Sequence, residues 1–290
     1  MSPEILHSTA FALTPEGGNP AGIVFDASHL TDAEMLAIAA RLGYPESVFV
    51  TDMSVPQSVE GAAEVAVRYF SPAAEVPFCG HATVAAAVAI AKRSGHRRLR
   101  FATTAGPVEI VTGIDELGVV TASFTSVEPS VREIDAGAYA DLLDVLGLVA
   151  SDIAEGFPAL EAFAGNRHPV LVLADRELFH QFRFAPRVLA PLMRRAGWEG
   201  TVTVLSRLDE DEFEARNLFP VGRISEDPAT GSAAAATGAY LRAIGRVPQG
   251  GRVRIRQGAH VGRPSLLVAD IPETGGITVT GSATEFVPAK

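Results

Sequence analysis

The chain has very few cysteines and lysines, and each shortage argues against a class of chemistry. Cys79 is the only cysteine among 290 residues, so no disulfide can form within the chain. Lys92 and Lys290 are the only lysines among 24 basic residues. Lys290 is the last residue and Lys92 lies at the polar end of an expected helix, whereas pyridoxal phosphate needs a buried lysine for its Schiff base. The sequence therefore argues against a pyridoxal-phosphate enzyme.

Long apolar segments are missing as well. The longest, around residues 82–91 and 233–241, are far shorter than the roughly 20 residues that span a bilayer, and we interpret them as buried helices. The N-terminal residues lack the basic and then apolar pattern of a signal peptide. Because no disulfide is possible either, these absences favour a cytoplasmic protein with no membrane partner.

Positive charge is scarce too. The net charge is −10 and the isoelectric point is near 5.2, whereas binding to phosphate backbones needs clustered lysine and arginine. One basic run, residues 92–100, follows an apolar helical pattern, and we interpret it as a solvated helix end. We therefore expect no nucleic-acid partner.

Sequence signals for metals and nucleotides are absent. The seven histidines show no close ligand spacing and no matched cysteine set; they stand at positions 7, 29, 81, 96, 168, 180 and 260. Neither a P-loop lysine nor a dinucleotide fingerprint follows the glycine pairs at 17–18 and 250–251, which suit turns. We therefore expect no metal and no cofactor.

Short β-like runs dominate the chain, and several alternate apolar and polar residues as half-buried strands do. The clearest helix is expected over Asp32–Leu42, where Thr31 and Glu34 form a capping box and Gly43 ends the apolar pattern. Further helices are expected over 136–146 and 187–196 and over the two alanine-rich stretches.

An internal echo links the two halves of the sequence. In each half an arginine (Arg68 or Arg216) precedes an aromatic and a proline, and an alanine-rich apolar helix follows. Four residues of each half match at one constant offset: Glu75, Pro77, Gly80 and Ala82 align with Glu226, Pro228, Gly231 and Ala233. This ordered pattern favours a duplication and hence two similar domains.

The echo places a glycine, Gly80 or Gly231, at the start of each alanine-rich helix. A helix start exposes backbone N–H groups and the positive end of the helix dipole, which bind a carboxylate well. Side chains that can hold or move protons flank both glycines: Cys79 and His81 at the first, and Asp227, Thr230 and Ser232 at the second. Proton transfer at carbon needs such acids and bases beside the substrate.

Each of these residues also has a purely structural interpretation. Asp227 suits a helix N-cap and Ser232 a first-turn residue bonded to the backbone. His81 suits a hydrogen-bonded packing residue and Cys79 a small core hydrophobe. Glu46 suits an exposed strand edge, although burial there would raise its pKa toward the value that a general base needs.

Five motifs, spread over nearly the whole chain, resemble signatures of the PhzF-like family, which is named for the phenazine-biosynthesis isomerase. They occur in the family's order: GNPAGIV at 18–24, PESVFV at 45–50, PFCGHAT at 77–83, EDPATGSA at 226–233 and QGAHVGRPS at 257–265. One such motif is weak, but five in order are specific.

The resemblance implies an α+β fold of the diaminopimelate-epimerase type. It consists of two similar domains, each a barrel-like β-sheet wrapped around a central helix, with the site in the cleft between them. We place the N-terminal domain at residues 1–125 and the C-terminal domain at 126–276, with 126–135 as the crossing. A last strand within 277–290 is expected to return to the first domain. The resemblance also implies a homodimer.

The family's activity implies a cofactor-independent isomerase that moves a proton on a small carboxylate-bearing substrate. Glu46 matches the glutamate that removes the proton. The other catalytic residues of the family match His81, Asp227 and Ser232. Backbone N–H groups of Gly80 and Gly231 would bind the substrate carboxylate. Further substrate contacts are expected from Asn19, Cys79 and Thr230.

Two other functions remain open at this point. The same fold hosts racemases and epimerases that use two cysteines, and the single cysteine excludes that symmetric mechanism. A racemase, epimerase or dehydratase in which Cys79 works with Asp227 or Thr230 is still possible, because residues 77–81 also resemble the cysteine motif of proline racemases. The other alternative is a non-catalytic small-molecule-binding protein of this fold, although a binding protein has no need of Glu46, His81 and Asp227 together.

Overall fold

The computed structural model describes residues 3–54, 61–222 and 224–288. The pattern of contacts divides the chain into two units. Unit 1 comprises Met1–Thr125 and Thr280–Lys290, and unit 2 comprises Ser126–Val279. The division falls inside β16 (Thr278–Glu285), so the first two residues of this strand belong to unit 2 and the rest to unit 1.

Eight strands of unit 1 form a closed barrel, in the order β1-β2-β3-β4-β6-β7-β8-β16. The barrel closes because β16 pairs antiparallel with β1. Besides β16, its strands are β1 (Ile5–Ala10), β2 (Asn19–Val24), β3 (Glu46–Ser54), β4 (Ala63–Phe70), β6 (Arg98–Thr103), β7 (Gly106–Ile114) and β8 (Val120–Thr125). The two-residue strand β5 (Glu75–Val76) pairs with β4. Closure removes the unpaired edges that an open sheet would expose.

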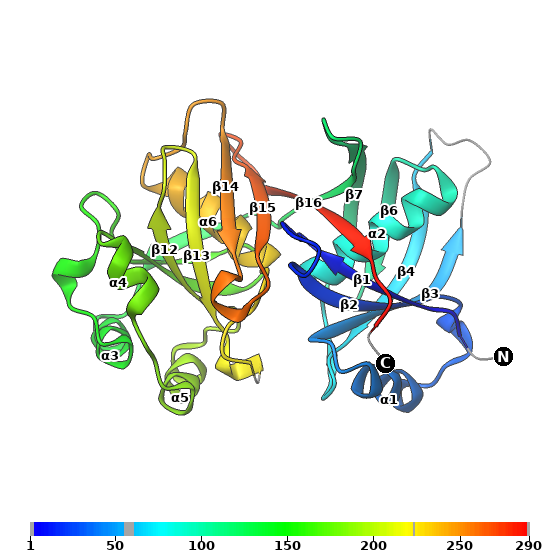
Figure 1. Ribbon diagram of the computed structural model, residues 1–290, viewed down its shortest axis with the longest axis horizontal. Coiled ribbons are helices and arrows are strands. Elements are labelled where there is room, and N and C mark those ends of the chain that lie inside the picture. Colours follow the sequence, from blue (N-terminus) through cyan, green and yellow to red (C-terminus); the bar gives the residue numbers. More distant parts are fainter. Residues whose placement is uncertain (1–2, 55–60, 223, 289–290) are drawn as a thin grey trace. The chain divides into compact units, whose positions relative to one another are not determined.

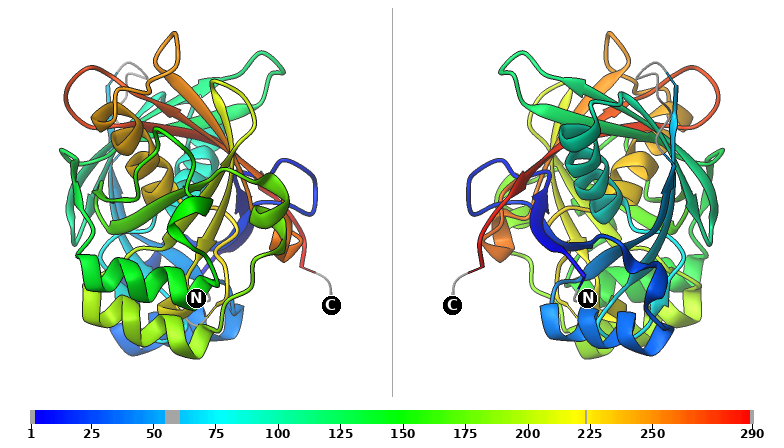
Figure 2. Two further views of the ribbon diagram at one scale, coloured as in Figure 1. Left: turned by 90° about the vertical axis from the view of Figure 1, so that its left-hand side faces the viewer. Right: turned by 90° about the vertical axis from the view of Figure 1, so that its right-hand side faces the viewer.

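The helix α2 (Gly80–Ser94) lies among the strands of this barrel (Figures 1 and 2). Residues 81–90 are buried without exception, as expected for a helix that is apolar on all sides. Alanine dominates this stretch, so the strands can approach the helix closely from every direction. Gly95 ends the helix with a φ of 75°, a left-handed conformation that glycine adopts without strain.

The helix α1 (Asp32–Leu42) packs on β3 and β4 through Met35, Ile38 and Ala39. Thr31 accepts a hydrogen bond from the Glu34 backbone, and the Glu34 carboxylate accepts one from the Thr31 backbone. The capping box expected from the sequence is thus confirmed, with both helix ends as predicted.

Unit 2 repeats the combination of a sheet and a buried helix. Its strand order is β9-β10-β11-β12-β13-β14-β15. The strands are β9 (Ser130–Glu133), β10 (Leu160–Phe163), β11 (Arg167–Leu173), β12 (Val202–Arg207), β13 (Glu212–Leu218), β14 (Arg252–Gln257) and β15 (Ser265–Asp270). The helix α6 (Gly231–Ala243) is buried along most of its length and packs on β9, β10, β11 and β15.

Three further helices belong to unit 2: α3 (Ala136–Leu146), α4 (Arg176–Gln181) and α5 (Pro186–Ala196). Figure 2 shows α3 and α5 side by side, and both contribute leucines to an apolar cluster around Trp198. Short 3₁₀ turns occur in both units: Ala27–His29, Ala150–Asp152, Pro220–Gly222 and Ala259–Val261.

The two units share their order of connections. In unit 1, β2 and β3 are parallel with α1 between them in the sequence, and β4 and β6 are parallel with α2 between them. In unit 2, α4 and α5 lie between the parallel strands β11 and β12, and α6 lies between the parallel strands β13 and β14. Parallel neighbours need such crossovers. This repetition supports the duplication inferred from the sequence.

Most expected helices are confirmed, and α2 and α6 extend beyond the apolar stretches at 82–91 and 233–241 that predicted them. The stretch 126–135, expected only as a crossing, contains β9, which pairs with β10. Its short, polar sequence carries little strand signal, and the pairing partner lies about 30 residues away. In the part of the chain that the structure describes, no helix has the length and apolar character needed to cross a membrane.

Candidate active site

The start of α2 carries two side chains that can hold or move protons, Cys79 and His81. Cys79 is the N-cap residue, and its side chain caps no backbone N–H group. The Thr83 hydroxyl donates to the Cys79 carbonyl at 2.8 Å and lies 2.6 Å from the Tyr69 hydroxyl, which fixes the first turn against β4. Burial raises the pKa of Tyr69, so this hydroxyl stays protonated.

Glu46, Cys79 and His81 form one compact cluster. The Cys79 thiol donates to Glu46 Oε2 at 3.7 Å, and Cys79 Sγ lies 3.3 Å from His81 Nδ1 and 3.8 Å from His81 Nε2. Glu46 Oε2 lies 3.6 Å from His81 Nε2. Glu46 is the first residue of β3, and its side chain is only 20% exposed. The interpretation of Glu46 as an exposed glutamate at a strand edge is therefore wrong.

His81 is a neutral imidazole at physiological pH. Burial lowers its pKa to about 3, and a hydrogen bond to the carbonyl of Pro20 opposes this shift only in part. Pro20 lies in β2 directly after Asn19, which is fully buried at the first position of that strand. The Asn19-Pro20 pair thus belongs to the surroundings of His81.

The start of α6 is organised around Asp227 and Gln257. The Thr230 hydroxyl donates to Asp227 Oδ2 at 2.5 Å. The Gln257 amide donates to the Asp227 carbonyl at 2.6 Å and to Thr230 Oγ1 at 3.0 Å, while its oxygen accepts from the Thr230 backbone at 3.1 Å. Thr230, not Asp227, is the N-cap residue, so the interpretation of Asp227 as a helix cap is wrong. Gln257 orders the loop that carries both side chains.

Ser232 has a partner that the sequence did not reveal. His168 Nε2 lies 3.1 Å from Ser232 Oγ. His168 Nδ1 lies 3.0 Å from the backbone nitrogen of Thr201 and 3.1 Å from both its carbonyl and its hydroxyl oxygen, so Thr201 holds the ring in place. Burial is the main cause that lowers the pKa of His168 to about 4, so the ring is neutral.

A buried ion pair supports the loop before α6. Arg216 Nη2 lies 2.6 Å from Glu226 Oε1, and both side chains are less than a tenth exposed. The second terminal nitrogen, Nη1, donates to the carbonyls of Phe179 and Phe182. Arg68 and Glu75 form the corresponding pair before α2, also at 2.6 Å, but in a more exposed setting. The echo in the sequence therefore has a counterpart in the bonding of the two loops.

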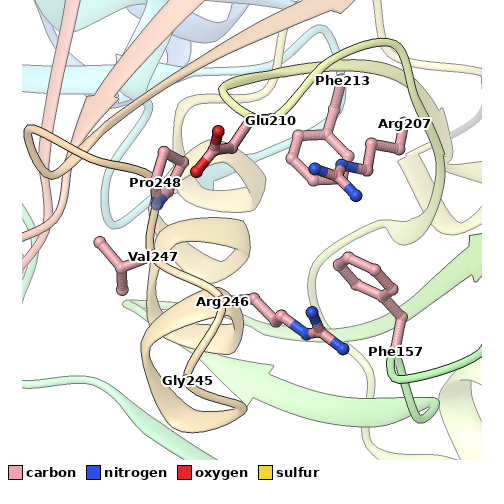
Figure 3. A pocket seen from close by; sticks show the side chains of 8 residues that line it. All are labelled: Phe157, Arg207, Glu210, Phe213, Gly245, Arg246, Val247 and Pro248. Carbon is pink, nitrogen blue, oxygen red and sulfur yellow. The ribbon is translucent and has the colours of Figure 1, made fainter.

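The described part of the chain also has a hollow at the other end of α6. Figure 3 shows this hollow, of about 210 Å³, where Arg246 lies beside Phe157 and Arg207 beside Phe213. Gly245 follows the C-terminal end of α6, whereas Ser232 stands in its first turn. The hollow contains none of the residues that the sequence nominated.

Within unit 1 the structure brings together three nominated side chains, Glu46, Cys79 and His81, at the residue that begins α2, Gly80. Within unit 2 it brings together Asp227 and Thr230 beside Gly231, and it places Ser232 on His168. His168 is the residue that sequence reasoning missed. A histidine inside the apolar run of β11 was the only signal.

Comparison with known proteins identifies the family. The sequence model of the PhzC-PhzF family, described as phenazine biosynthesis-like protein, matches residues 8–288. The chain belongs to this family. The resemblance stated from the five motifs is thereby confirmed.

Relatives of this PhzF-family chain carry isomerase names. It is 34% identical to an uncharacterized isomerase of Deinococcus radiodurans, over 92% of this chain and 86% of the relative. It is 29% identical to the trans-2,3-dihydro-3-hydroxyanthranilate isomerase of Pseudomonas fluorescens, over 90% and 87% of the two chains. The PhzF-family chain is thus an isomerase.

Solved structures confirm the fold class. A phenazine biosynthesis protein of the PhzF family from Bacillus anthracis has a TM-score of 0.80 at 24% identity and covers 98% of this chain, which covers 96% of it. A probable proline racemase from Agrobacterium radiobacter has a TM-score of 0.62 at 14% identity, with 98% and 91% covered. At these identities the likeness shows the fold alone, which is the two-domain epimerase type expected from the sequence.

Proposed function

We propose that this isomerase moves a proton on a small carboxylate-bearing substrate by general acid–base catalysis, without a cofactor. The observation that carries this proposal is the half-buried Glu46 carboxylate, which lies within 4 Å of both Cys79 and His81 at the start of α2. This cluster joins a base, a thiol and a neutral imidazole at a helix start suited to an anion.

The first step would be removal of a proton from carbon by Glu46. The C–H bond breaks, an O–H bond forms on the Glu46 carboxyl, and the electron pair moves into the carbon framework. The N–H of Gly80 at the start of α2 would bind the substrate carboxylate, and the neutral ring of His81 would add a dipole without a competing charge. Return of the proton from Glu46 to another carbon on the same face of the substrate completes the isomerisation.

We also propose roles in catalysis for residues of unit 2, as the family resemblance implies. The Thr230 hydroxyl donates a hydrogen bond to Asp227 Oδ2, which orients this carboxylate. Ser232 Oγ is hydrogen-bonded to His168 Nε2 and would contact an oxygen of the substrate. The N–H of Gly231 would contribute to anion binding as Gly80 does. Asn19 would support the site from β2.

Proton exchange in D₂O tests this assignment directly. Cyclic and linear amino and hydroxy acids, including dihydro-hydroxyanthranilate, would be incubated with the protein, and the loss of C–H signals followed by NMR. Exchange by the wild type should fall at least 100-fold in Glu46→Gln and persist in Cys79→Ala. Glu133→Gln, a change at an exposed residue of β9, is the matched control and should exchange normally. Near-normal exchange by Glu46→Gln would refute the role of Glu46.

A thiol-based mechanism is the second candidate, because the Cys79 thiol contacts both Glu46 and His81. In that case exchange would be lost in Cys79→Ala and retained in part by Glu46→Gln, and the activity would be that of a racemase, epimerase or dehydratase.

We also propose a homodimer that acts in the cytoplasm, as the family resemblance and the lack of disulfides suggest. Light scattering on the eluted protein should give twice the mass of 30.4 kDa. A monomeric mass over a wide concentration range would contradict the dimer.

A further inference from the structure

Three side-chain atoms of the cluster of Glu46, Cys79 and His81 form a nearly regular triangle. Its sides are 3.7 Å from Glu46 Oε2 to Cys79 Sγ, 3.8 Å from Cys79 Sγ to His81 Nε2, and 3.6 Å from His81 Nε2 to Glu46 Oε2. The centre of such a triangle lies about 2.1 Å from each corner, within the roughly 2.0–2.3 Å range of zinc–ligand bonds. Among the residues that the structure describes, Glu46, Cys79 and His81 are also the one group of three potential metal ligands.

We propose that Glu46, Cys79 and His81 form a binding site for a zinc ion. The three side chains supply the sulfur, nitrogen and oxygen ligands that zinc prefers, one of each kind. The thiolate and the carboxylate carry together two negative charges, which a divalent zinc ion neutralises in a largely buried site. A tetrahedral ion held by three protein ligands keeps a fourth position for water or a substrate oxygen.

Binding would proceed by exchange of a proton for the metal. The S–H bond of Cys79 breaks, the thiol proton passes to the buffer, and a Zn–S bond forms without any change of oxidation state. His81 binds through a ring nitrogen, as imidazole ligands of zinc do. The metal would replace the direct contacts among the three side chains, so small side-chain rotations suffice.

Sequence spacing could not reveal this site. Cys79 and His81 are only two residues apart, and Glu46 precedes them by more than 30 residues. The pairing of β2 with β3 brings Glu46 opposite Ala21, next to the carbonyl of Pro20 that accepts from His81. Only the folded barrel therefore assembles the set.

A zinc ion on Glu46 would occupy the carboxylate that is proposed to remove the proton. Zinc is thus an inhibitor of proton exchange, a consequence that rests on the proposed function. The binding itself rests on geometry alone. Removal of zinc by a chelator should restore exchange.

Cobalt provides the test, because Co²⁺ replaces Zn²⁺ and absorbs in the visible. Cys79 is the only cysteine, so a sulfur-to-cobalt charge-transfer band reports this site and no other. One equivalent of CoCl₂ should produce this band together with tetrahedral visible bands, and one equivalent of ZnCl₂ should abolish both. The affinity for ZnCl₂ should fall at least 10-fold in Glu46→Gln and in His81→Asn.

A second pair of histidines supplies the control. His180 Nδ1 lies 3.3 Å from His260 Nε2 and could bind a metal on the surface of unit 2. His260→Asn should leave the cobalt spectrum and the zinc affinity unchanged. Unfolding of each variant without metal checks that it is folded. Absence of the charge-transfer band in the folded wild type, or unchanged zinc affinity in folded Glu46→Gln and His81→Asn, would overturn the proposal.

Proton exchange with and without ZnCl₂ separates the two proposals. A cobalt spectrum from a protein that shows no exchange even without metal leaves the zinc site standing and contradicts the proposed function. Exchange that continues under saturating ZnCl₂, without a charge-transfer band for cobalt, leaves the function standing and contradicts the zinc site.

Discussion

His168 Nε2 and Ser232 Oγ share a hydrogen bond of 3.1 Å, although 64 residues separate the two in the sequence. The imidazole is held in turn by the backbone of Thr201, in the segment that leads into β12. The side chain at the start of α6 is thus held by a residue of β11, the strand that pairs in parallel with β12. This relationship makes His168 the positioning residue for Ser232.

His168→Phe should lower the proton-exchange rate about 10-fold, because Ser232 loses the hydrogen-bond partner that orients it. Ser232→Ala should have a similar effect. The double variant should be no slower than the slower single variant, since both changes remove one interaction. Additive losses in the double variant would mean that His168 acts independently of Ser232.

Gly200→Ala should displace His168. A Cβ atom at this position would stand 2.4 Å from His168 Cε1, which no real contact allows, and the fully buried ring has little room to move. We expect a loss of about 1–3 kcal/mol in the free energy of unfolding, together with slower exchange. The matched control is Gly113→Ala, where the added Cβ meets Thr121 at an ordinary 3.5 Å. Equal effects of the two changes would contradict this account.

Glu226→Gln and Glu75→Gln should differ in stability although they remove equivalent ion pairs. Arg216 is 4% exposed, so the loss of its partner leaves a buried charge and should destabilise the protein by about 3–5 kcal/mol. Arg68 is 26% exposed and also contacts Asp32, so Glu75→Gln should cost about 1 kcal/mol or less. Denaturant unfolding measures both, and similar losses would refute the distinction.

His96→Leu should stabilise the protein. Both ring nitrogens of His96 are buried, and neither has a hydrogen-bond partner among the described residues. Replacing an unsatisfied polar ring by an apolar side chain should raise the free energy of unfolding by about 1–3 kcal/mol. The exposed His29→Leu serves as the control and should change it little. A lower melting temperature for His96→Leu would show that the ring is satisfied in solution.

Stability should fall as the pH is lowered from about 6.5 to about 4, in part because of His168. Its folded pKa of about 4 lies below the ordinary 6.5, so in this range the unfolded chain binds the proton and the folded chain does not. The contribution of neutral His168 to the free energy of unfolding is fully present above about pH 6.5 and amounts to about 3 kcal/mol or less. His168→Gln should show a shallower decline in unfolding experiments over this range, and an unchanged decline would contradict the assignment.

The elements whose cause is local could be predicted from the sequence. The capping box of Thr31 and Glu34 and the stop at Gly43 define α1 within the chain itself, and the alanine-rich helices follow from their uniform apolar character. The motif at 77–83 likewise correctly predicted that Cys79 and His81 are neighbours at a helix start.

The partners of these residues could not be predicted, because distant strands supply them. Glu46 reaches Cys79 only through the barrel of unit 1, and His168 reaches Ser232 only through the stacking of α6 on β11. Aspartate is a residue type typical of helix N-caps, and only the folded loop shows that Thr230, not Asp227, occupies the N-cap position of α6. The residue types of the candidate site could thus be predicted from the sequence, whereas their contacts with one another depend on the pairing of distant strands.

The path of β16 has a consequence for the synthesis of the chain. The barrel of unit 1 closes only when β16 pairs with β1, so residues 1–125 lack the eighth strand of their barrel until the ribosome has made all of unit 2 and then β16. Unit 2 has no such dependence, since its residues are contiguous. The unit that begins to form first is therefore the last that can be completed, and a ribosome stalled near residue 276 would hold an open barrel whose exposed strand edges invite aggregation.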